Sequence, residues 1–253
     1  MLIPVFINVR FMFFMLISGV NFTVQYRLFA ERRVRRFFQD PELHFYILII
    51  CVATLAVAAT LIGRQHIDMA RATRQALFQV VSITTTTGFS NADYELWPSF
   101  AQLIFLSLMF CGGCTGSTAG GMKVARVVLL TKVVRREFRR IVQRRGIFTV
   151  RLGESPVDEN AVRGLLNLVH LALIVNFCAC LILTALGLDV LTSISAVAAS
   201  MFNVGPGLHN VGPYDNYGAL PQSAKWVLSF CMLAGRLEFY SLLVLIAPDF
   251  WRR

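Results

Sequence analysis

Five apolar runs, each about as long as one membrane crossing, constrain this sequence more than any other feature. A helix rises about 1.5 Å per residue, so roughly 20 apolar residues cross the hydrocarbon core of a bilayer. Runs of this kind lie at about 2 to 24, 43 to 63, 96 to 118, 162 to 187 and 222 to 247. Two further helical stretches, at about 72 to 85 and 189 to 202, are too short to cross. The pattern predicts an all-α, polytopic membrane protein.

The composition supports a membrane setting rather than nucleic-acid binding. Hydrophobic side chains make up 56% of the 253 residues and charged ones 15%, which is too apolar for a soluble domain. An excess of 24 Lys and Arg over 14 Asp and Glu suits nucleic-acid binding when the basic groups share one face. Here they cluster beside the apolar runs, so they indicate topology, and no nucleic-acid partner is expected.

Basic clusters after alternate apolar runs predict the orientation of the chain. Arginines between residues 27 and 36 follow the first run, a longer cluster between residues 123 and 151 follows the third, and Arg252 and Arg253 follow the fifth. Basic loops stay in the cytoplasm, and two crossings separate each cluster from the next, so the C-terminus is expected to be cytoplasmic. A smaller basic group would lie on the outer side: Arg64, Arg71 and Arg74.

No constellation typical of an enzyme or a metal centre stands out. The six cysteines fall in or beside apolar runs, which favours packing roles over disulfides. Cys111 and Cys114 form a CxxC, but no second pair with metal-ligand spacing accompanies it. Neither a nucleophile with its base nor a phosphate-binding loop is evident. We therefore expect no enzymatic activity and no covalently bound cofactor.

The chain contains an internal repeat of span, short helix, glycine turn and span. Residues 43 to 118 match residues 162 to 247, with Gly88 aligned to Gly205. A backbone that enters the membrane and turns back leaves unpaired peptide groups, which is tolerable only beside a watery cavity or inside protein. Each unit therefore predicts two helices enclosing a re-entrant pore helix, as in potassium channels, and the pair of units predicts a pore.

The first glycine turn has the composition of an ion-binding segment. It reads ITTTTGFSN from Ile83 to Asn91, and the short helix is expected to end near Thr85. A ring of backbone carbonyls can replace the water shell of a potassium ion, and glycine permits the backbone angles that aim those carbonyls inward. An ordinary threonine-rich loop is the alternative. The predicted ion-binding residues are Thr86, Thr87, Gly88 and Phe89.

The second glycine turn occupies the matching place in the second unit and reads SMFNVGPGLHN. Asn203 replaces a threonine and Pro206 stiffens the end of the segment, so a ring built from both turns would be asymmetric. Two matching turns in matching units strengthen the prediction of an ion site. Its residues in this turn are Asn203, Val204, Gly205 and Pro206.

A stretch rich in glycine and hydroxyl residues follows the third apolar run. Such a composition disfavours a stiff helix, because glycine loses more backbone freedom in a helix than other residues do. The residues alone leave two interpretations open: an intramembrane loop, or a close-packed helix crossing made of small residues. The residues concerned are Gly112, Gly113, Gly116, Ser117, Thr118, Gly120 and Gly121.

Two ionisable residues, Arg236 and Glu238, interrupt the fifth apolar run. Charges inside a membrane are costly, which makes them candidates for function. Arg236 lies about 11 residues beyond Lys225, hence roughly 16 Å along a helix, so it is expected in the inner half of the bilayer. It could snorkel toward the cytoplasm or face a pore, and Glu238 could pair with a neighbouring helix.

Four segments, TTTGFS, FCGGCTGSTAGGMKV, NVGPG and LAGRLE, carry a family resemblance in their order and spacing. They resemble the C-terminal half of the membrane subunit of Trk-type potassium uptake systems, within the Trk/Ktr/HKT superfamily. The likeness covers essentially the whole chain, with a mild departure at Thr87, where a small residue such as alanine is frequent. Family members carry four pore repeats around one pore.

The resemblance implies a division of the chain into four parts. Residues 1–40 would hold the last helix of an incomplete second pore repeat and a cytosolic loop. Residues 41–121 would form the third pore repeat, with helix, pore helix, filter and broken helix. Residues 122–160 would be a basic cytosolic linker, and residues 161–253 the fourth pore repeat.

The resemblance also implies roles for the singled-out residues. The two glycine turns become the third and fourth segments of a potassium selectivity filter. The stretch from Gly112 to Gly121 becomes a gating loop beneath the filter, with Lys123 at its cytoplasmic edge, and Arg236 becomes an electrostatic barrier in the pore. The family setting is the bacterial cytoplasmic (inner) membrane, where the subunit forms a homodimer and binds a cytosolic nucleotide-binding regulatory subunit.

These features predict potassium transport, as part of a pore-forming subunit in a lipid bilayer. One pore needs four filter segments by the resemblance, so we expect this chain to need N-terminal pore repeats, in the same or a separate chain. A secondary ion-coupled transporter with broken helices is one alternative, and it would show paired carboxylates or an anion site at half-helix N-termini. A non-conducting truncated fragment is another, and sodium selectivity stays open.

Overall fold

The computed structural model describes residues 2–32, 37, 39–143, 148–152, 155–237, 239, 241–242, 244 and 248–251. Arg252, Arg253 and Glu238, singled out in the sequence, lie outside these residues. The described chain is helical apart from two strands of two residues each, which confirms the all-α prediction. Its elements are α1 (Leu2–Ser18), α2 (Phe22–Phe29), α4 (Pro41–Gln65), α5 (Met69–Thr84), η1 (Tyr94–Leu96), α6 (Ser99–Phe110), α7 (Val124–Val142), β1 (Arg151–Leu152), β2 (Ser155–Pro156), α8 (Glu159–Ala185), α9 (Val190–Met201), η2 (His209–Val211), η3 (Tyr217–Ala219), α10 (Gln222–Arg236) and α12 (Pro248–Trp251).

Two of the described helices, α4 and α8, are each long and apolar enough to cross a bilayer. A third candidate is bent, because Phe6–Ser18 and α2 meet at an angle of 106°. The predicted runs at about 96 to 118 and 222 to 247 are not single helices. Helix α6 ends at Phe110, where the glycine-rich stretch begins, and α10 ends at Arg236, shortly before Phe239 adopts a positive φ of 55° that no helix accommodates.

Aspartate side chains cap the N-termini of three α-helices and fix where each helix starts. The Asp40 side chain accepts hydrogen bonds from the first-turn amides of α4, and Pro41 supplies a backbone angle suited to that turn. Asp68 caps α5 and Asp189 caps α9 in the same way. The two short helices of the repeat therefore begin with the same local signal.

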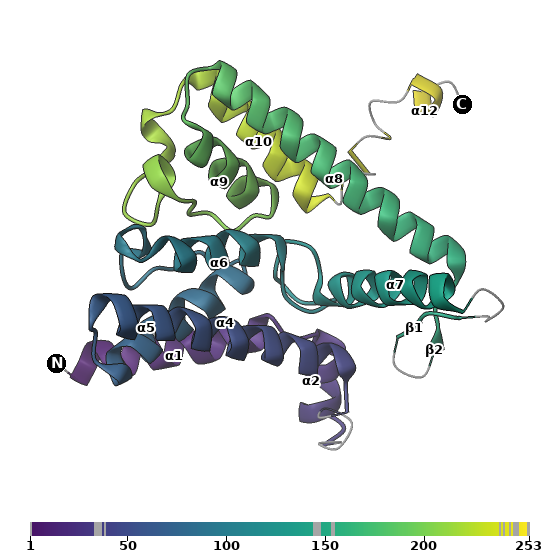
Figure 1. The fold of residues 1–253 in the computed structure, drawn as a ribbon, viewed down its shortest axis with the longest axis horizontal. Helices are drawn as coiled ribbons and strands as arrows, with labels where there is room; N and C mark the ends of the chain where they lie inside the picture. The colour runs from purple at the N-terminus through teal and green to yellow at the C-terminus, as the bar shows by residue number, and fades with distance from the viewer. Residues whose placement is uncertain are drawn as a thin grey trace.

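The helices form two groups joined by α7 (Figure 1). In one group α5 packs against α4 and α6, and in the other α9 packs against α8 and α10. Contacts between α6 and α9 connect the groups, and α1 packs against α5. In the view of Figure 1 the second group lies above the first, with α7 and the short strands at one side.

The two short helices form the centre of the molecule, and the long ones form its outside. Nine residues of α9, from Thr192 to Met201, are buried, and so is the second half of α5, from Phe78 to Thr84. By contrast, Leu55 on α4 is 69% exposed and Phe177 on α8 is 64% exposed. Apolar side chains exposed on long apolar helices are typical of lipid contact. In the turns that follow these two helices, Val204 is buried, residues 86–88, 203 and 206 are half-buried, and Phe89 and Gly205 are exposed.

Candidate functional site

The first glycine turn leaves the end of α5 with a tightly held backbone. The amide of Thr86 donates to the carbonyl of Ile83 at 3.0 Å, and the amide of Thr87 donates to the carbonyl of Ser82 at 2.9 Å. Thr86 has a positive φ of 54° and Gly88 one of 78°. The helix therefore ends where the sequence predicted, and the chain reverses its course within a few residues.

The second glycine turn leaves α9 with the same backbone pattern. The amide of Asn203 donates to the carbonyl of Ser200 at 3.1 Å, and the amide of Val204 donates to the carbonyl of Ala199 at 2.8 Å. Asn203 has a positive φ of 56° and Gly205 one of 107°. Asn203 thus corresponds to the first residue of the other turn, and the two turns are copies in backbone as well as in sequence position.

The two turns lie directly against one another. A Cβ atom on Gly88 would stand 2.5 Å from the carbonyl oxygen of Val204 and 3.1 Å from Cδ of Pro206. No side chain fits at that point, so glycine is required there by proximity as well as by its φ. The structure therefore brings together the two segments predicted to bind an ion.

Most of the carbonyl groups in the two turns have no partner within the described chain. The described residues donate no hydrogen bond to the carbonyl oxygens of six turn residues: Thr86, Thr87, Gly88, Asn203, Val204 and Pro206. The carbonyl of Phe89 accepts from the hydroxyl of Ser82 at 2.6 Å, and that of Gly205 accepts from the hydroxyl of Tyr217 at 2.8 Å. Carbonyl oxygens without a donor in the described chain can be satisfied by water, by another donor or by a cation.

Side chains behind the turns hold them in place. The hydroxyls of Thr85 and Thr87 lie 2.7 Å apart, and the hydroxyl of Tyr94 donates to the carbonyl of Gly207 at 2.9 Å. Tyr94 belongs to the segment after the first turn and Gly207 to the segment after the second. This hydrogen bond therefore joins the segments that follow the two turns, and so connects the two repeats.

The glycine-rich stretch is a loop and not a helix of small residues. Cys111 and Met122 form an isolated parallel bridge, the amide of Gly112 donates to the carbonyl of Met122 at 2.8 Å, and the amide of Val124 donates to that of Gly113 at 3.1 Å. The stretch therefore leaves α6, folds back on itself and returns to begin α7. Of the two interpretations that the residues left open, the structure excludes the helix of small residues.

A carboxylate that the sequence did not indicate holds both this loop and the first turn of α7. Oε1 of Glu42, in the first turn of α4, accepts from the amide of Thr115 at 2.6 Å and from the amide of Ala125 at 3.1 Å. The bend between α1 and α2 supports the same loop, since the amide of Cys114 donates to the carbonyl of Gly19 at 2.8 Å. The sequence does show an acidic residue at the start of an apolar run. It could not indicate which amides Glu42 binds, because they lie 73 and 83 residues away.

The loop lies directly beneath both turns. The amide of Gly120 donates to the Thr86 hydroxyl at 2.7 Å. A Cβ atom on Gly120 would stand 2.5 Å from the carbonyl oxygen of Phe202 and 3.2 Å from Cβ of Asn203. The predicted loop and the predicted ion-binding segments are therefore in direct contact.

Arg236 shares a cavity with the loop. This cavity, of about 220 Å³, is bounded by loop residues 117–123 and, on α10, by Gly235 and Arg236. Lys123 also lines it and donates through Nζ to the carbonyl oxygen of Ala119. No carboxylate of the described chain forms an ion pair with Arg236. The space beneath the turns therefore holds the positive charge of Arg236, although more than 100 residues of sequence separate this arginine from the loop.

On the opposite side of the turns, the connecting segments carry acidic groups. Burial, followed by the nearby carboxylates of Asp215 and Asp93, raises the pKa of Glu95 above its ordinary value. Asp189 lies 3.8 Å from Nε2 of His209. The sequence did not indicate the pair of Glu95 and Asp215, because these residues belong to different repeats and meet only in the folded chain.

Comparisons with known proteins identify close relatives. The TrkH family model, described as a cation transport protein, matches residues 4–253. The Trk system potassium uptake protein TrkH of Vibrio parahaemolyticus is 40% identical over 249 residues, which cover 97% of this chain and 51% of the relative. The protein of the same name from Escherichia coli is 38% identical over 252 residues, covering 97% and 51% respectively.

A solved structure agrees with the fold described above. The crystal structure of the potassium transporter TrkH from Vibrio parahaemolyticus matches with a TM-score of 0.90 at 38% identity, over 97% of this chain and 53% of that chain. The chain thus spans about half the length of the curated relatives it matches.

Proposed function

Because the chain belongs to the TrkH family of cation transport proteins, we propose that it forms part of the ion pathway of a potassium transporter. One observation carries this proposal: two turns with the same backbone pattern lie against each other, and six of their carbonyl oxygens have no described partner. Such oxygens can replace the hydration shell of a potassium ion. The eight turn residues, 86–89 and 203–206, are the proposed filter segments.

The helices that end at the turns contribute to the attraction of a cation. The carbonyl end of a helix carries a partial negative charge, and α5 and α9 both present that end to the turns. A transporter that binds an anion at its broken helices would present helix N-termini instead. The direction of the two helices therefore favours a cation filter over that alternative.

The loop between Gly112 and Lys123 is the proposed gate. It contacts both turns from below, and the cavity that it bounds holds Arg236. A cation leaving the filter on this side meets the loop backbone and then the guanidinium charge, which opposes its passage. Movement of the loop would open the path, and Arg236 would set the electrostatic barrier.

The rest of the transporter is also a proposal. We assign residues 41–121 and 161–253 to two pore repeats, 1–40 to a preceding helix and loop, and 122–160 to a cytosolic linker. Two turns make half of a fourfold ring, so further filter segments come from outside these residues. The expected setting is the bacterial inner membrane with a cytoplasmic C-terminus, a homodimer, and a cytosolic nucleotide-binding regulatory subunit.

A chimeric transporter tests the proposal. Residues 1–253 would replace the corresponding half of the Vibrio parahaemolyticus relative, in a bacterial strain that lacks its own potassium uptake systems. We expect the chimera to restore growth at low potassium and rubidium uptake that potassium inhibits more strongly than sodium does. A chimera that reaches the membrane in normal amount but transports no rubidium, or that prefers sodium, would refute the proposal.

A further inference from the structure

Helix α7 has a buried face and a surface face of unusual chemistry. Its buried side chains include Val128 and Val133, and the helix packs against α4 and α8. Its surface combines arginines with large apolar groups: Phe138 is 66% exposed, Ile141 72% and Val142 81%. A helix with basic and exposed apolar side chains together is typical of the boundary between a membrane and the cytoplasm.

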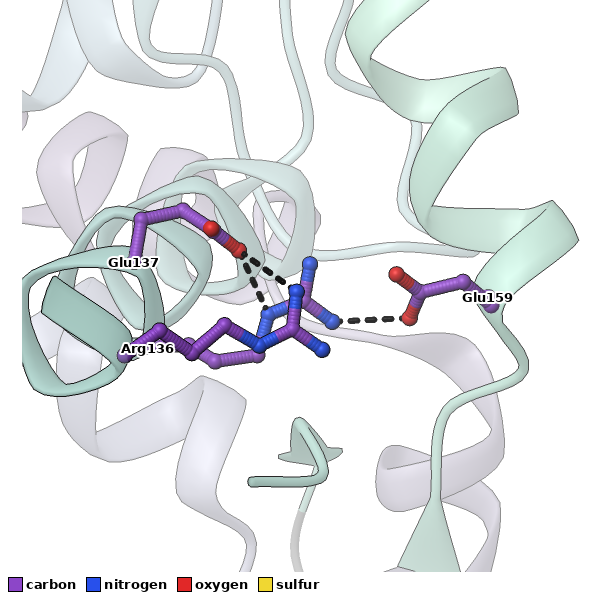
Figure 2. A network of polar contacts seen from close by, with 4 residues as sticks. Arg136, Glu137 and Glu159 are labelled. Carbon is purple, nitrogen blue, oxygen red and sulfur yellow. Dashed lines mark hydrogen bonds and ion pairs between the residues drawn. The ribbon is translucent and has the colours of Figure 1, made fainter. Parts of the chain in front are cut away.

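Two contacts place α7 at the level where the long helices begin. The amide of Ala125, near its N-terminus, donates to Glu42 in the first turn of α4. Arg136 donates through Nη1 to Glu159, the first residue of α8, at 2.7 Å (Figure 2). Since α4 and α8 are the two described helices that are by themselves long and apolar enough to cross a bilayer, α7 lies at one surface of that bilayer.

A cavity lined by basic side chains lies between α7 and β1. Its volume is about 360 Å³, and Phe148, Thr149 and Val150 form its apolar and neutral part. None of the described residues that line it is acidic. Five cationic side chains line it: Lys132, Arg135, Arg136, Arg139 and Arg151.

One of these five cations is neutralised, and the other four have no ion pair among the described residues. Arg136 is 8% exposed and pairs with Glu137 at 2.9 Å and Glu159 at 2.7 Å; the hydrogen bond to Glu159 raises the pKa of Arg136 (Figure 2). Lys132 donates to the backbone carbonyl of Arg151 at 2.8 Å and keeps its charge. Arg135, Arg139 and Arg151 form no ion pair with any carboxylate of the described chain.

An apolar groove continues from the basic cavity. It has a volume of about 490 Å³ and shares Arg135, Arg139 and Phe148 with that cavity. Its remaining lining is Phe138, Val142 and Gln143. The basic cavity and the apolar groove thus meet at Arg135 and Arg139.

We propose that this site binds an anionic phospholipid, with its phosphate headgroup in the basic cavity and part of an acyl chain in the apolar groove. Four cations that form no ion pair with a described carboxylate favour an anion, and basic pockets at the cytoplasmic ends of membrane helices hold lipid headgroups. A free phosphate ion would leave the exposed Phe138 and Val142 uncovered, whereas a lipid covers both parts. The lipid would fasten α7, and through it the loop that ends at Lys123, to the membrane surface.

Lipid titration of the purified protein tests this site. The protein in a neutral detergent would be titrated with phosphatidylglycerol or with phosphatidylcholine, and bound lipid counted by native mass spectrometry. We expect phosphatidylglycerol to bind about tenfold more tightly than phosphatidylcholine, because several basic groups face the headgroup. Equal binding of the two lipids would overturn the proposal.

Matched variants separate the site from general charge. Arg135→Gln with Arg139→Gln should weaken phosphatidylglycerol binding by roughly tenfold. Arg64→Gln with Arg71→Gln removes the same charge elsewhere on the surface and should leave that binding unchanged. All four arginines are exposed, so neither double variant disturbs the core, and an unaltered size-exclusion profile checks this. Equal loss of binding in both double variants would refute a defined site.

A second comparison distinguishes a lipid from a soluble anion. Phe138→Ser with Val142→Ser alters only the apolar groove and should weaken phosphatidylglycerol binding severalfold without removing any basic group. Inorganic phosphate at millimolar concentration should not displace the lipid. If the groove variant binds as the unaltered protein does, or if inorganic phosphate competes, the site takes a free anion and the lipid proposal is wrong.

Discussion

Replacing Gly88 with alanine places a methyl group where the two proposed filter segments meet. The new Cβ would stand 2.5 Å from the Val204 carbonyl oxygen, whereas ordinary contact begins at 3.4 Å. The difference, 3.4 minus 2.5, is 0.9 Å, so one or both turns must move by about that distance. The carbonyl that moves is one of those proposed to coordinate the ion.

The substitution also introduces backbone strain, which a control variant can match. Gly88 has a φ of +78°, and an alanine in the left-handed region costs ~1–2 kcal/mol. Gly187 has a φ of +94°, and no atom lies within 4 Å of the position that a methyl group would take there. Gly187→Ala therefore carries similar strain without any displacement of a carbonyl.

The assay is rubidium uptake by the chimeric transporter, divided by the amount of protein in the membrane. A displacement of about 1 Å in a positioned group costs on the order of 100-fold in rate in enzymes. We expect uptake to fall at least about tenfold in Gly88→Ala, equivalent to ~1.4 kcal/mol. Gly187→Ala should remain within about twofold of the unaltered chimera. Equal uptake by the two variants would show that the contact between the turns is irrelevant to transport.

Four further outcomes follow from the same geometry. Gly120→Ala, which brings a methyl group 2.5 Å from the carbonyl oxygen of Phe202, should change rubidium flux severalfold more than it changes abundance, and unchanged flux would argue against a gate. Arg236→Ala should raise cation flux severalfold, because two like charges 4 Å apart repel by about 1 kcal/mol even in water; unaltered flux would remove the barrier role. Glu42→Ala should lower the free energy of unfolding by ~2 kcal/mol through loss of two hydrogen bonds to a carboxylate, measured by thermal unfolding in detergent, and a midpoint equal to that of the unaltered protein would contradict it. Burial raises the pKa of Glu95, so the folded chain holds a proton on this residue that the unfolded chain releases. The stability that this proton contributes is therefore lost as pH rises from 4.5 through the raised pKa of Glu95. Glu95→Gln should flatten that fall in the thermal midpoint, and an identical pH profile would contradict the shift.

Local sequence signals predicted the helices and turns of the site well. The end of α5 at Thr84 follows from residue types that act on their own backbone. The composition of the stretch after Phe110 left a loop and a close-packed helix open, and the structure shows the loop. The apolar run at about 222 to 247 is not one helix, because α10 ends at Arg236. That run was predicted from its apolar length alone. The positive φ of Phe239 lies just beyond the end of the helix, and the sequence does not predict it, because phenylalanine has no preference for that backbone angle.

Long-range partners could not be predicted, because they depend on which elements pack together. Glu42 accepts from one amide of the loop and one of α7, 73 and 83 residues away, and the residues next to Glu42 in the sequence do not indicate either partner. The pairing of Arg136 with Glu159 is similar, since the sequence alone shows only one more arginine in a basic cluster. Such contacts form only because α7 packs against α4 and α8 in the folded chain.

By itself the sequence determined an all-α chain with apolar helices and two matching turns, because hydrophobic length and glycine act locally on the backbone. Only the tertiary structure decided that Gly88 meets Val204 and that Arg236 faces the loop. These contacts join repeats more than 100 residues apart. They exist because the packing of α6 against α9 brings the two repeats together, and no local preference encodes that packing.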